Sequence, residues 1–443
     1  MTIDKGGIII TPEMKITLVL SASKRYREAV EKGIRFRSYA PTTLIQLAAL
    51  VPPELEAEVK IFDLMGAPLP ENIDADIIGI STITAGAPEA YRIAAMAKKK
   101  GITVVIGGSH ATLLPQEALQ HADAVVVGYA EKTWPQLLRD FKNNQLKPMY
   151  KDFSSPFSIP MPPLNRRMLP RKHYLFTNTL EATRGCPNNC EFCVLKDITS
   201  NCHWTRNIKD VREEIETMGK QILFLDSSPT EFKDYMKKLW KELIPLRIKW
   251  YGASTFRFTQ DEEAIKLAAQ SGCKGLLIGF ESLNQGALDG INKAFNNAAR
   301  FREGIKRLHD HGIAILGCFV FGFDEDDPSI FDKTVEFSDA AKIDIVKYAV
   351  LTPLPGTPIF NKLKKENRIL TEDWNLYDTE HVVYRPKQMS PQELEEGCKR
   401  AFYETYKYSS IIKRIMRKGS PWFYSILGNI GFRRVGYTYY HSQ

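Results

Sequence analysis

Three closely spaced cysteines are the residues of this chain best suited to chemistry. Cys186, Cys190 and Cys193 lie in "ATRGCPNNCEFCVLKD", residues 182–197, at intervals of four and three. A structural zinc site uses four ligands, so Cys202 or His203 would have to complete it, and paired Cys-x-x-Cys knuckles are missing. Three thiolates on one loop instead suit three irons of a [4Fe–4S] cluster, which leaves the fourth iron open to another ligand.

Length and composition indicate an ordinary globular protein of two or three domains, since 443 residues exceed one typical core. Seven cysteines, four of them between Cys186 and Cys202, do not resemble a disulfide framework and favour the reducing cytoplasm. The N-terminal apolar run is too short for a signal peptide. Apolar stretches such as "IAILGCFVFGF", residues 313–323, are too short to span a bilayer and indicate buried strands.

The positive charge does not predict a nucleic-acid partner. A net charge of +8 is mild for this length, and most Lys and Arg are scattered over predicted helix faces. The segment 386–443, predicted to be mainly helical, differs because from Ala401 onward it combines basic and aromatic residues with few acids. Two interpretations stay open for it, a peripheral contact with a membrane or lipid-like substrate, and a cap that packs its aromatics on the preceding domain.

The first 153 residues alternate short β-branched runs with helical patterns. This alternation predicts a doubly wound, flavodoxin-like or Rossmann-like α/β domain with a parallel sheet. Ligands of such sheets bind beyond the carboxyl ends of the strands. The predicted strands are residues 15–21, 58–64, 76–82, 103–108 and 124–128, with helices near 41–50 and at 88–100.

A proline-rich stretch, residues 154–170, is expected to link this domain to a second one. Residues 171–385 again alternate, and six strand–helix units predict a partial (β/α)6 TIM-like barrel with its chemistry at the carboxyl ends of the strands. The predicted strands are 179–183, 222–226, 249–255, 275–280, 314–322 and 344–351, with helices at 207–218, 231–243, 260–271, 294–311 and 328–341.

The cysteine spacing, with Phe192 before the last cysteine, resembles the radical S-adenosylmethionine (SAM) superfamily. The resemblance implies that the open iron binds SAM, and that an electron from the cluster cleaves SAM into methionine and a 5′-deoxyadenosyl radical. It also implies an electron donor such as flavodoxin or ferredoxin. The residues expected at the SAM site are Phe192, Asp226, Ser227, Ser254, Arg257, Glu281 and Ser282.

The loops "STITAGAP", "GGSHATLLPQEAL" and "VVVGYAEKTW" resemble the cobalamin-binding domain that precedes many radical SAM enzymes. An Asp-x-His-x-x-Gly motif is absent from residues 1–160, and "GYAE" replaces the usual acidic loop. His110 is a candidate either for an axial cobalt ligand or for hydrogen bonding. The alternative is a flavodoxin-like domain without a cofactor. The resemblance implies cobalamin contacts at Ser81, Thr82, Thr84, Gly107, Gly108, His110, Gly128, Tyr129 and Glu131.

Together the two resemblances imply a cobalamin-dependent radical SAM enzyme. The expected activity is methylation of an unactivated carbon of a small molecule, such as a lipid or natural product: the radical abstracts hydrogen and methylcobalamin donates the methyl group. Radical cyclisation, ring contraction or rearrangement with the same cofactors is the alternative. A non-catalytic metal-binding protein is the alternative from another class.

Overall fold

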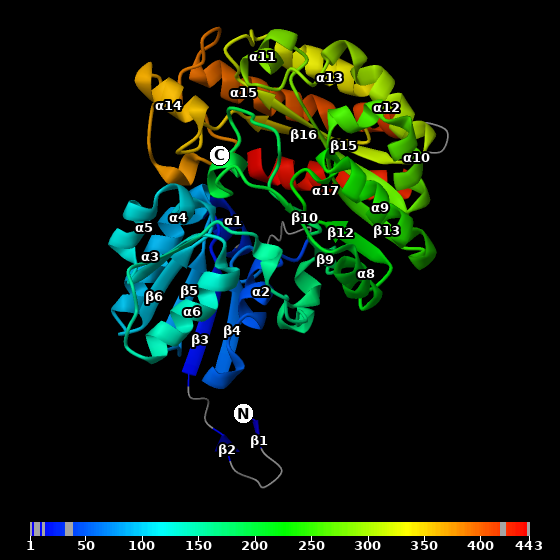
Figure 1. Cartoon of the computed structure of the whole chain (residues 1–443). Helices are drawn as coiled ribbons and strands as arrows, with labels where there is room; N and C mark the ends of the chain where they lie inside the picture. Colours follow the sequence, from blue (N-terminus) through cyan, green and yellow to red (C-terminus); the bar gives the residue numbers. More distant parts are fainter. Residues whose placement is uncertain (1, 4–8, 11–13, 32–38, 417–421, 441–443) are drawn as a thin grey trace. The chain divides into compact units, whose positions relative to one another are not determined.

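The computed structural model describes residues 2–3, 9–10, 14–31, 39–416 and 422–440. The chain divides into two compact units. The first contains Met1–Thr177 and Asp197–Ser200, and the second contains Asn178–Lys196 and Asn201–Gln443. Figure 1 shows a sheet with helices on its faces in each unit, which confirms the predicted α/β class.

A six-stranded parallel sheet forms the first unit. Its order is β4-β3-β5-β6-β7-β8, and the five predicted strands are all present. The sixth, β8, was not predicted. The strands are β3 (Met14–Leu20), β4 (Ala57–Asp63), β5 (Ile77–Ser81), β6 (Thr103–Gly107), β7 (Ala124–Gly128) and β8 (Met149–Asp152), while β1 (Thr2–Ile3) and β2 (Ile9–Ile10) form a separate antiparallel pair.

Helices cover both faces of this sheet, and each face has its own apolar core. β-branched runs such as "AVVVG" form the strands because side chains on both faces are buried. The helices are α1 (Lys24–Glu31), α2 (Thr43–Ala49), α3 (Ala87–Lys98), α4 (Ser109–Leu113), α5 (Pro115–His121) and α6 (Ala130–Lys142).

The strand order reverses between β3 and β5. After β3 the chain moves outward to β4, and it then returns to place β5 on the other side of β3. At such a switch point the loops beyond the carboxyl ends of the strands diverge and leave room for a ligand. The loops after β3, β5, β6 and β7 therefore form the candidate ligand-binding edge of this unit.

The predicted linker is part of the first unit. Residues 154–170 contain short 3₁₀ turns and no α-helix or strand, but the boundary falls after Thr177. Leu169 and Tyr174 are buried with Ala40 and Ile45, and the Tyr174 hydroxyl donates to Asp63 at 2.7 Å. Leu169 thus anchors the end of the proline-rich segment to the first unit.

The second unit contains the predicted six-stranded parallel sheet in sequential order, β9-β12-β13-β14-β15-β16. No pairing between β9 and β16 occurs among the described residues, so the barrel is partial, as expected. The first strand is shorter than predicted. The bounds are β9 (Thr179–Leu180), β12 (Gln221–Phe224), β13 (Lys249–Thr255), β14 (Cys273–Glu281), β15 (Ala314–Phe321) and β16 (Ile345–Val350).

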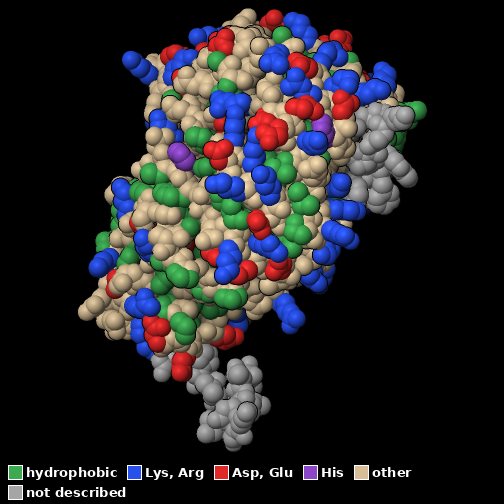
Figure 2. Space-filling model, turned by 45° about the vertical axis from the view of Figure 1, so that its right-hand side comes forward, with side chains coloured by type: hydrophobic (Ala, Val, Ile, Leu, Met, Phe, Trp, Pro, Cys, Tyr) green, Lys and Arg blue, Asp and Glu red, His purple; other side chains and the backbone are tan. Residues whose placement is uncertain are grey.

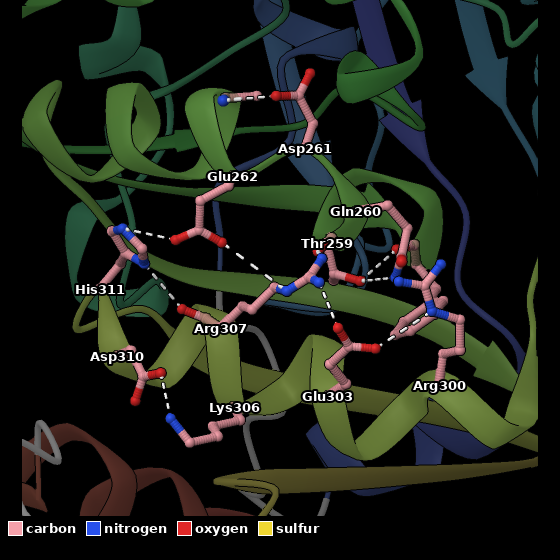
Figure 3. A network of polar contacts seen from close by, with 12 residues as sticks. Thr259, Gln260, Asp261, Glu262, Arg300, Glu303, Lys306, Arg307, Asp310 and His311 are labelled. Atoms are coloured by element: carbon pink, nitrogen blue, oxygen red, sulfur yellow. Dashed lines mark hydrogen bonds and ion pairs between the residues drawn. The ribbon is translucent and has the colours of Figure 1, made fainter.

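Helices cover the outer face of this sheet, where the main core lies. Figure 3 shows one polar network of this helical layer: Arg307 of α12 contacts Glu303 and Glu262 and donates to the Thr259 carbonyl at 3.0 Å, and His311 contacts Glu262 at 3.5 Å. The network fastens α12 to α10. The helices are α8 (Ile208–Glu216), α9 (Lys233–Leu243), α10 (Glu262–Gln270), α11 (Gln285–Gly290), α12 (Phe301–Asp310), α13 (Ile330–Ala340) and α14 (Pro358–Lys365).

The C-terminal segment is helical and packs on the second unit. It contains α15 (Pro391–Thr405), α16 (Tyr408–Ile415) and α17 (Trp422–Tyr440), while residues 417–421 and 441–443 of the predicted segment lie outside the described residues. The Tyr406 hydroxyl donates to the Val346 carbonyl at 2.6 Å, and the buried Arg414 donates to Asn429 at 2.7 Å. These contacts support the cap interpretation.

No helix in the described part of the chain is long and apolar enough to cross a bilayer. On the face shown in Figure 2, Lys and Arg side chains are interspersed with Asp and Glu, as the sequence pattern indicated.

Candidate functional site

The three cysteines lie on the loop 185–203, which we call the cluster loop; they belong to the second unit, as does all of the loop except Asp197–Ser200. Strands β10 (Thr183–Arg184) and β11 (Trp204–Thr205) pair antiparallel and close its base. Gly185 has φ +81°, and a Cβ there would lie 2.3 Å from the Cys202 carbonyl oxygen. The two ends of the loop can therefore approach this closely only because residue 185 is a glycine.

Asp226, after β12, anchors the entrance of the cluster loop. It is 2% exposed and accepts hydrogen bonds from the Ala182 amide at 3.0 Å and the Thr183 hydroxyl at 2.7 Å. Burial raises the pKa of Asp226 to about 7, although these donors oppose the rise. The structure thus gives Asp226 a role in holding the loop, and its predicted contact with SAM stays a prediction.

The cysteines are half-buried free thiols. Burial raises the pKa of Cys190 to about 11, and the neighbouring Cys193 and Cys186 add to the rise. Burial also raises the pKa of Cys193, so these two thiols resist ionisation until cations neutralise them, as bound irons would. Between them, the Glu191 amide donates to the Ile291 carbonyl at 3.1 Å, and its carbonyl accepts from the Ile359 amide at 3.2 Å. Backbone contacts on both sides therefore fix the ligand spacing.

Zinc receives no support from this geometry. Cys202 is exposed, and the His203 ring packs against Phe232 with centroids 5.6 Å apart. In the described ranges, no three His, Cys, Asp or Glu side chains converge as ligands of a single metal ion.

A buried ion pair lies beside the cluster loop. Glu281 ends β14 with φ +67°, and its carboxylate pairs with the ammonium of Lys293. Burial alone would lower the pKa of Lys293, but the charges of Glu281, Cys190 and Cys193 outweigh it and raise the pKa, so Lys293 stays cationic. Its Nζ also lies 5.9 Å from the centre of the Phe192 ring.

A second carboxylate organises the carboxyl end of β13. Glu231 accepts from the Thr255 hydroxyl at 2.5 Å and from Arg257 at 2.8 Å. The Arg257 guanidinium also lies 4.3 Å from the centre of the Phe295 ring. Arg257 is therefore held from two sides, with 38% of its side chain still exposed.

The three predicted serines differ in accessibility. Ser227 is exposed after β12. Ser254 is buried and shares a hydrogen bond of 2.8 Å with Thr230, while the Ser282 hydroxyl accepts from the Asn284 amide at 3.0 Å. Ser227 is thus the exposed one of the three, and its predicted contact with SAM stays a prediction, as do those of the other two.

In the first unit, the glycines after β6 and β7 are required by close backbone approach. Gly108 has φ +95°, and a Cβ there would lie 2.5 Å from the Thr82 carbonyl oxygen. Gly128 has φ +81°, and its Cβ would lie 2.2 Å from the Asp152 carbonyl oxygen. The Thr112 hydroxyl joins the two turns, because it donates to the Gly108 carbonyl at 2.9 Å and accepts from the Gly128 amide at 3.0 Å.

The loop after β5 faces the same edge. The hydroxyl of Ser21, after β3, donates to Thr82 at 2.7 Å across the switch point, and Thr82 donates to the Ile83 carbonyl at 2.9 Å. Thr84 is buried, whereas the Ile83 side chain is 58% exposed. Small and hydroxyl-bearing residues around one exposed apolar side chain suit a large, partly apolar cofactor.

Comparisons with known proteins identify the families of both domains. Residues 180–337 match the family model of the radical SAM superfamily, and residues 68–138 match that of the B12 binding domain. Bacteriochlorophyllide d C-12(1)-methyltransferase from Chlorobaculum tepidum is 33% identical over 417 residues, which cover 89% of this chain and 89% of that protein. The chain belongs to the cobalamin-dependent radical SAM methyltransferases.

Two further similarities agree with this family. Bacteriochlorophyllide d C-8(2)-methyltransferase from the same organism is 30% identical, covering 77% of this chain and 80% of that protein. The structure of the radical SAM methyltransferase TsrM from Kitasatospora setae, solved with tryptophan and the SAM analogue aza-SAM, has a TM-score of 0.66. It is 16% identical and covers 96% of this chain and 98% of that chain, so it supports the fold.

The family confirms the predicted enzyme class and the cofactors, which are a [4Fe–4S] cluster, SAM and cobalamin. As a radical SAM methyltransferase, the chain acts on an unactivated carbon of a small molecule. The findings favour methyl transfer over the radical rearrangement considered above, an enzyme over a non-catalytic protein, and a cobalamin domain over an empty flavodoxin-like one.

In this radical SAM methyltransferase, His110 is engaged within its own domain. It is fully buried on α4, and its Nε2 lies 3.0 Å from the Tyr91 hydroxyl and 3.3 Å from Glu117. Burial lowers the pKa of His110, so the neutral ring is favoured. These contacts support the hydrogen-bonding interpretation over the axial-ligand one.

Several residues at the two sites were missed by sequence reasoning. Glu231 and Lys293 become visible only as the partners of Arg257 and Glu281, and Asn296 donates from its buried amide to the carbonyl of Gly279 at 2.9 Å. Lys293, Phe295 and Asn296 share the segment "INKAFNN" after α11. Its three asparagines, three apolar residues and lone lysine form no recognisable motif, so only an alignment of relatives would have signalled it.

Proposed function

We propose that this enzyme methylates an unactivated carbon on a tetrapyrrole or a similarly large apolar ring system. The observation that carries the proposal is the 33% identity to a bacteriochlorophyllide methyltransferase across both units, because it includes the cluster loop and the cobalamin loops together. Relatives that share both sites over nearly their whole length are expected to share the size and polarity of the substrate.

In this proposal the second unit holds the cluster through Cys186, Cys190 and Cys193. Phe192, Ser227 and Arg257 would hold SAM beside them. When bound, the cluster and SAM supply a hydrogen-abstracting radical, and cobalamin supplies the methyl group. The protein itself positions these groups and excludes water. Glu231 holds Arg257 in place, and Glu281 holds Lys293.

The first unit holds cobalamin along its switch-point edge. Gly107, Gly108 and Gly128 let the backbone approach the corrin, because side chains there would block it. The hydroxyls of Ser81, Thr82 and Thr84 line the slot for the nucleotide tail, and Tyr129 and Glu131 lie on the loop that faces the corrin amides. An electron carrier such as flavodoxin or ferredoxin reduces the cluster.

A peripheral membrane contact has one supporting feature. Tyr408, Ile412 and Met416 follow one another at four-residue intervals along and just beyond α16, and their side chains are 65%, 49% and 69% exposed. The exposed Lys413 lies beside them. An outward apolar stripe with an adjacent cation suits the interface of an anionic membrane, and an apolar substrate would be delivered there.

The methylation proposal is tested with anaerobically reconstituted enzyme, SAM, methylcobalamin, a reductant and bacteriochlorophyllide d. A product heavier by one CH₂, formed together with 5′-deoxyadenosine and S-adenosylhomocysteine, is expected. The triple variant Cys186→Ala, Cys190→Ala, Cys193→Ala should form none of the three. Formation of 5′-deoxyadenosine with an isomerised or dehydrogenated product would contradict methyl transfer.

The membrane proposal has its own experiment. Ile412→Glu combined with Met416→Glu should abolish co-flotation with anionic liposomes, because both changes place charge in the apolar stripe. Leu175→Glu is the control, because it changes an apolar side chain that is 82% exposed and lies outside the stripe. Equal flotation of all three proteins would contradict the assignment of α16.

A further inference from the structure

The inner face of the second unit's six-stranded sheet leaves a large apolar side chain accessible. On β14, Leu276, Ile278 and Phe280 point into the helix-covered core and are at most 2% exposed. Side chains of a strand alternate between faces, so Leu277 points the other way, and it is 39% exposed. A large apolar side chain left accessible on a central strand indicates a surface that receives a ligand.

The register extends this surface across the sheet. Leu277 pairs with Leu316 of β15, and Leu316 pairs with Ile345 of β16. Neighbours in register point to the same side of a parallel sheet. The inner face therefore carries a row of apolar side chains. The Tyr251 ring lies over Gly275 and the Glu281–Lys293 pair lies over Gly279, and Ile345 packs against Gly428 of α17 at the end of the row.

Two lysines lie at this surface, Lys293 over Gly279 and Lys347 on β16. Lys347 of β16 pairs in register with Cys318 of β15, and Cys318 pairs with Gly279 of β14, so all three belong to the inner face. Lys347 is exposed, and no ion pair or hydrogen bond engages its ammonium among the described residues. By contrast Lys293, the other lysine near Cys318, is neutralised by Glu281.

Lys347 lies close enough to the radical chemistry to orient a substrate. Cys318 lies in register between Lys347 and Gly279, and a Cβ at Gly279 would lie 3.1 Å from the Lys293 ammonium. That ammonium lies 5.9 Å from the centre of the Phe192 ring on the cluster loop. A continuous set of neighbours in the same unit therefore connects the cluster loop to Lys347. A molecule bound on the inner face has one end near Lys347 and another toward the carboxyl ends of the strands.

We propose that Lys347 binds a carboxylate of an otherwise apolar substrate that lies along the inner face of the second unit's sheet. The proposal rests on the carbon methylation proposed above and adds the charged group that the substrate carries. A single ammonium on an apolar surface matches a monoanion, whereas a phosphate would call for further donors. The one charged contact fixes the orientation of a substrate whose apolar surface alone would permit several.

The experiment compares an acid with its neutral ester on the reconstituted holoenzyme. Pheophorbide a and pheophorbide a methyl ester are titrated by absorbance, without reductant. Wild type should bind the acid about tenfold more tightly than the ester, which is the contribution of one charge-assisted contact. Lys347→Met should bind acid and ester equally, with unchanged affinity for the ester, and Lys347→Arg should keep the preference. Lys249→Met, an exposed lysine at the start of β13, serves as the matched control.

The outcomes separate the two proposals. Equal binding of acid and ester by wild type, or an unchanged preference in Lys347→Met, overturns the role of Lys347. A loss of SAM affinity in Lys347→Met, with the acid preference intact, assigns the ammonium to the SAM carboxylate and also overturns it. Tight, Lys347-dependent binding of acids without methylation of any of them overturns the proposed function and leaves the carboxylate site standing.

Discussion

Lys293 and Glu281 form a buried ion pair next to the three-cysteine loop, with their side chains 8% and 10% exposed. Glu281 reaches Lys293 because the last residue of β14 adopts φ +67°, a conformation uncommon for residues with a side chain. Backbone strain of this kind concentrates at functional sites. The pair therefore keeps the Lys293 ammonium close to Cys190 and Cys193, although the net charge of the pair is zero.

Lys293→Met should make the cluster harder to reduce. Removing a positive charge near the thiolates leaves the added electron less stabilised, so the midpoint potential should fall by roughly 60 mV, a tenfold change for a one-electron couple. Potentiometric titration followed by electron paramagnetic resonance measures this. The double variant Lys293→Met, Glu281→Gln removes both charges and should shift the potential less. Identical potentials in all three proteins would exclude an electrostatic role.

The same variants test the stability of the pair. Lys293→Met leaves Glu281 buried and unpaired, which should cost about 3–5 kcal/mol of unfolding free energy. The double variant should recover most of that loss because no buried charge is left alone. Chemical denaturation of the apoprotein measures both, and a double variant no more stable than the single one would contradict the prediction.

The raised pKa of Asp226 predicts that the stability of the fold depends on pH. Its pKa is raised to about 7 in the folded chain from an ordinary 3.8, so between about pH 4 and 7 the native state binds more protons than the unfolded state. The contribution of this group to stability therefore falls as pH rises through that window, by at most about 1.4 kcal/mol per pH unit. The urea midpoint should fall between pH 5 and pH 7.5, and this fall should be smaller in Asp226→Asn than in wild type. A parallel decline would show that Asp226 does not titrate in this range.

Gly108 predicts a steric effect at the cobalamin edge. Gly108→Ala places a Cβ 2.5 Å from the Thr82 carbonyl oxygen and adds strain at φ +95°, so the fold should lose about 2–4 kcal/mol and cobalamin should be retained poorly. Gly101→Ala is the matched control, because Gly101 has φ +73° but nothing within 4 Å of the new Cβ. It should cost only the strain, about 1–2 kcal/mol, with normal cobalamin content. Equal losses of stability and cobalamin in both variants would contradict the steric argument.

Arg257 predicts a change in SAM affinity. Arg257→Met removes a guanidinium held by Glu231 and Phe295, and Glu231 keeps its hydrogen bond from Thr255. We expect SAM to bind about tenfold more weakly by equilibrium dialysis, the loss of one charge-assisted contact. Arg212→Met removes an arginine paired with Glu216 and Glu242 on the exposed helix surface and should leave SAM binding unchanged. Unaltered affinity in Arg257→Met would remove Arg257 from the SAM site.

The sequence by itself determined the class of chemistry and both folds. Cys186, Cys190 and Cys193 are close along the chain, so their spacing already states that three thiolates share one loop. Strands 103–108 and 124–128 are buried on both faces, so their composition alone predicts a parallel sheet. Glycines 108 and 128 were also recognisable because each lies in a turn at a strand end.

Tertiary structure decided which charged and polar side chains meet. Glu231 and Arg257, Glu281 and Lys293, and Asp226 and Thr183 are separated along the chain, and each pair forms only because strands and loops bring their ends together. The inner-face position of Lys347 likewise depends on the register of β15 and β16. Composition marks the segment 154–170 as rich in proline, but only the fold shows that Leu169 is buried beside Ala40 and Ile45. Contacts between distant residues are set by packing free energy, which no local pattern encodes.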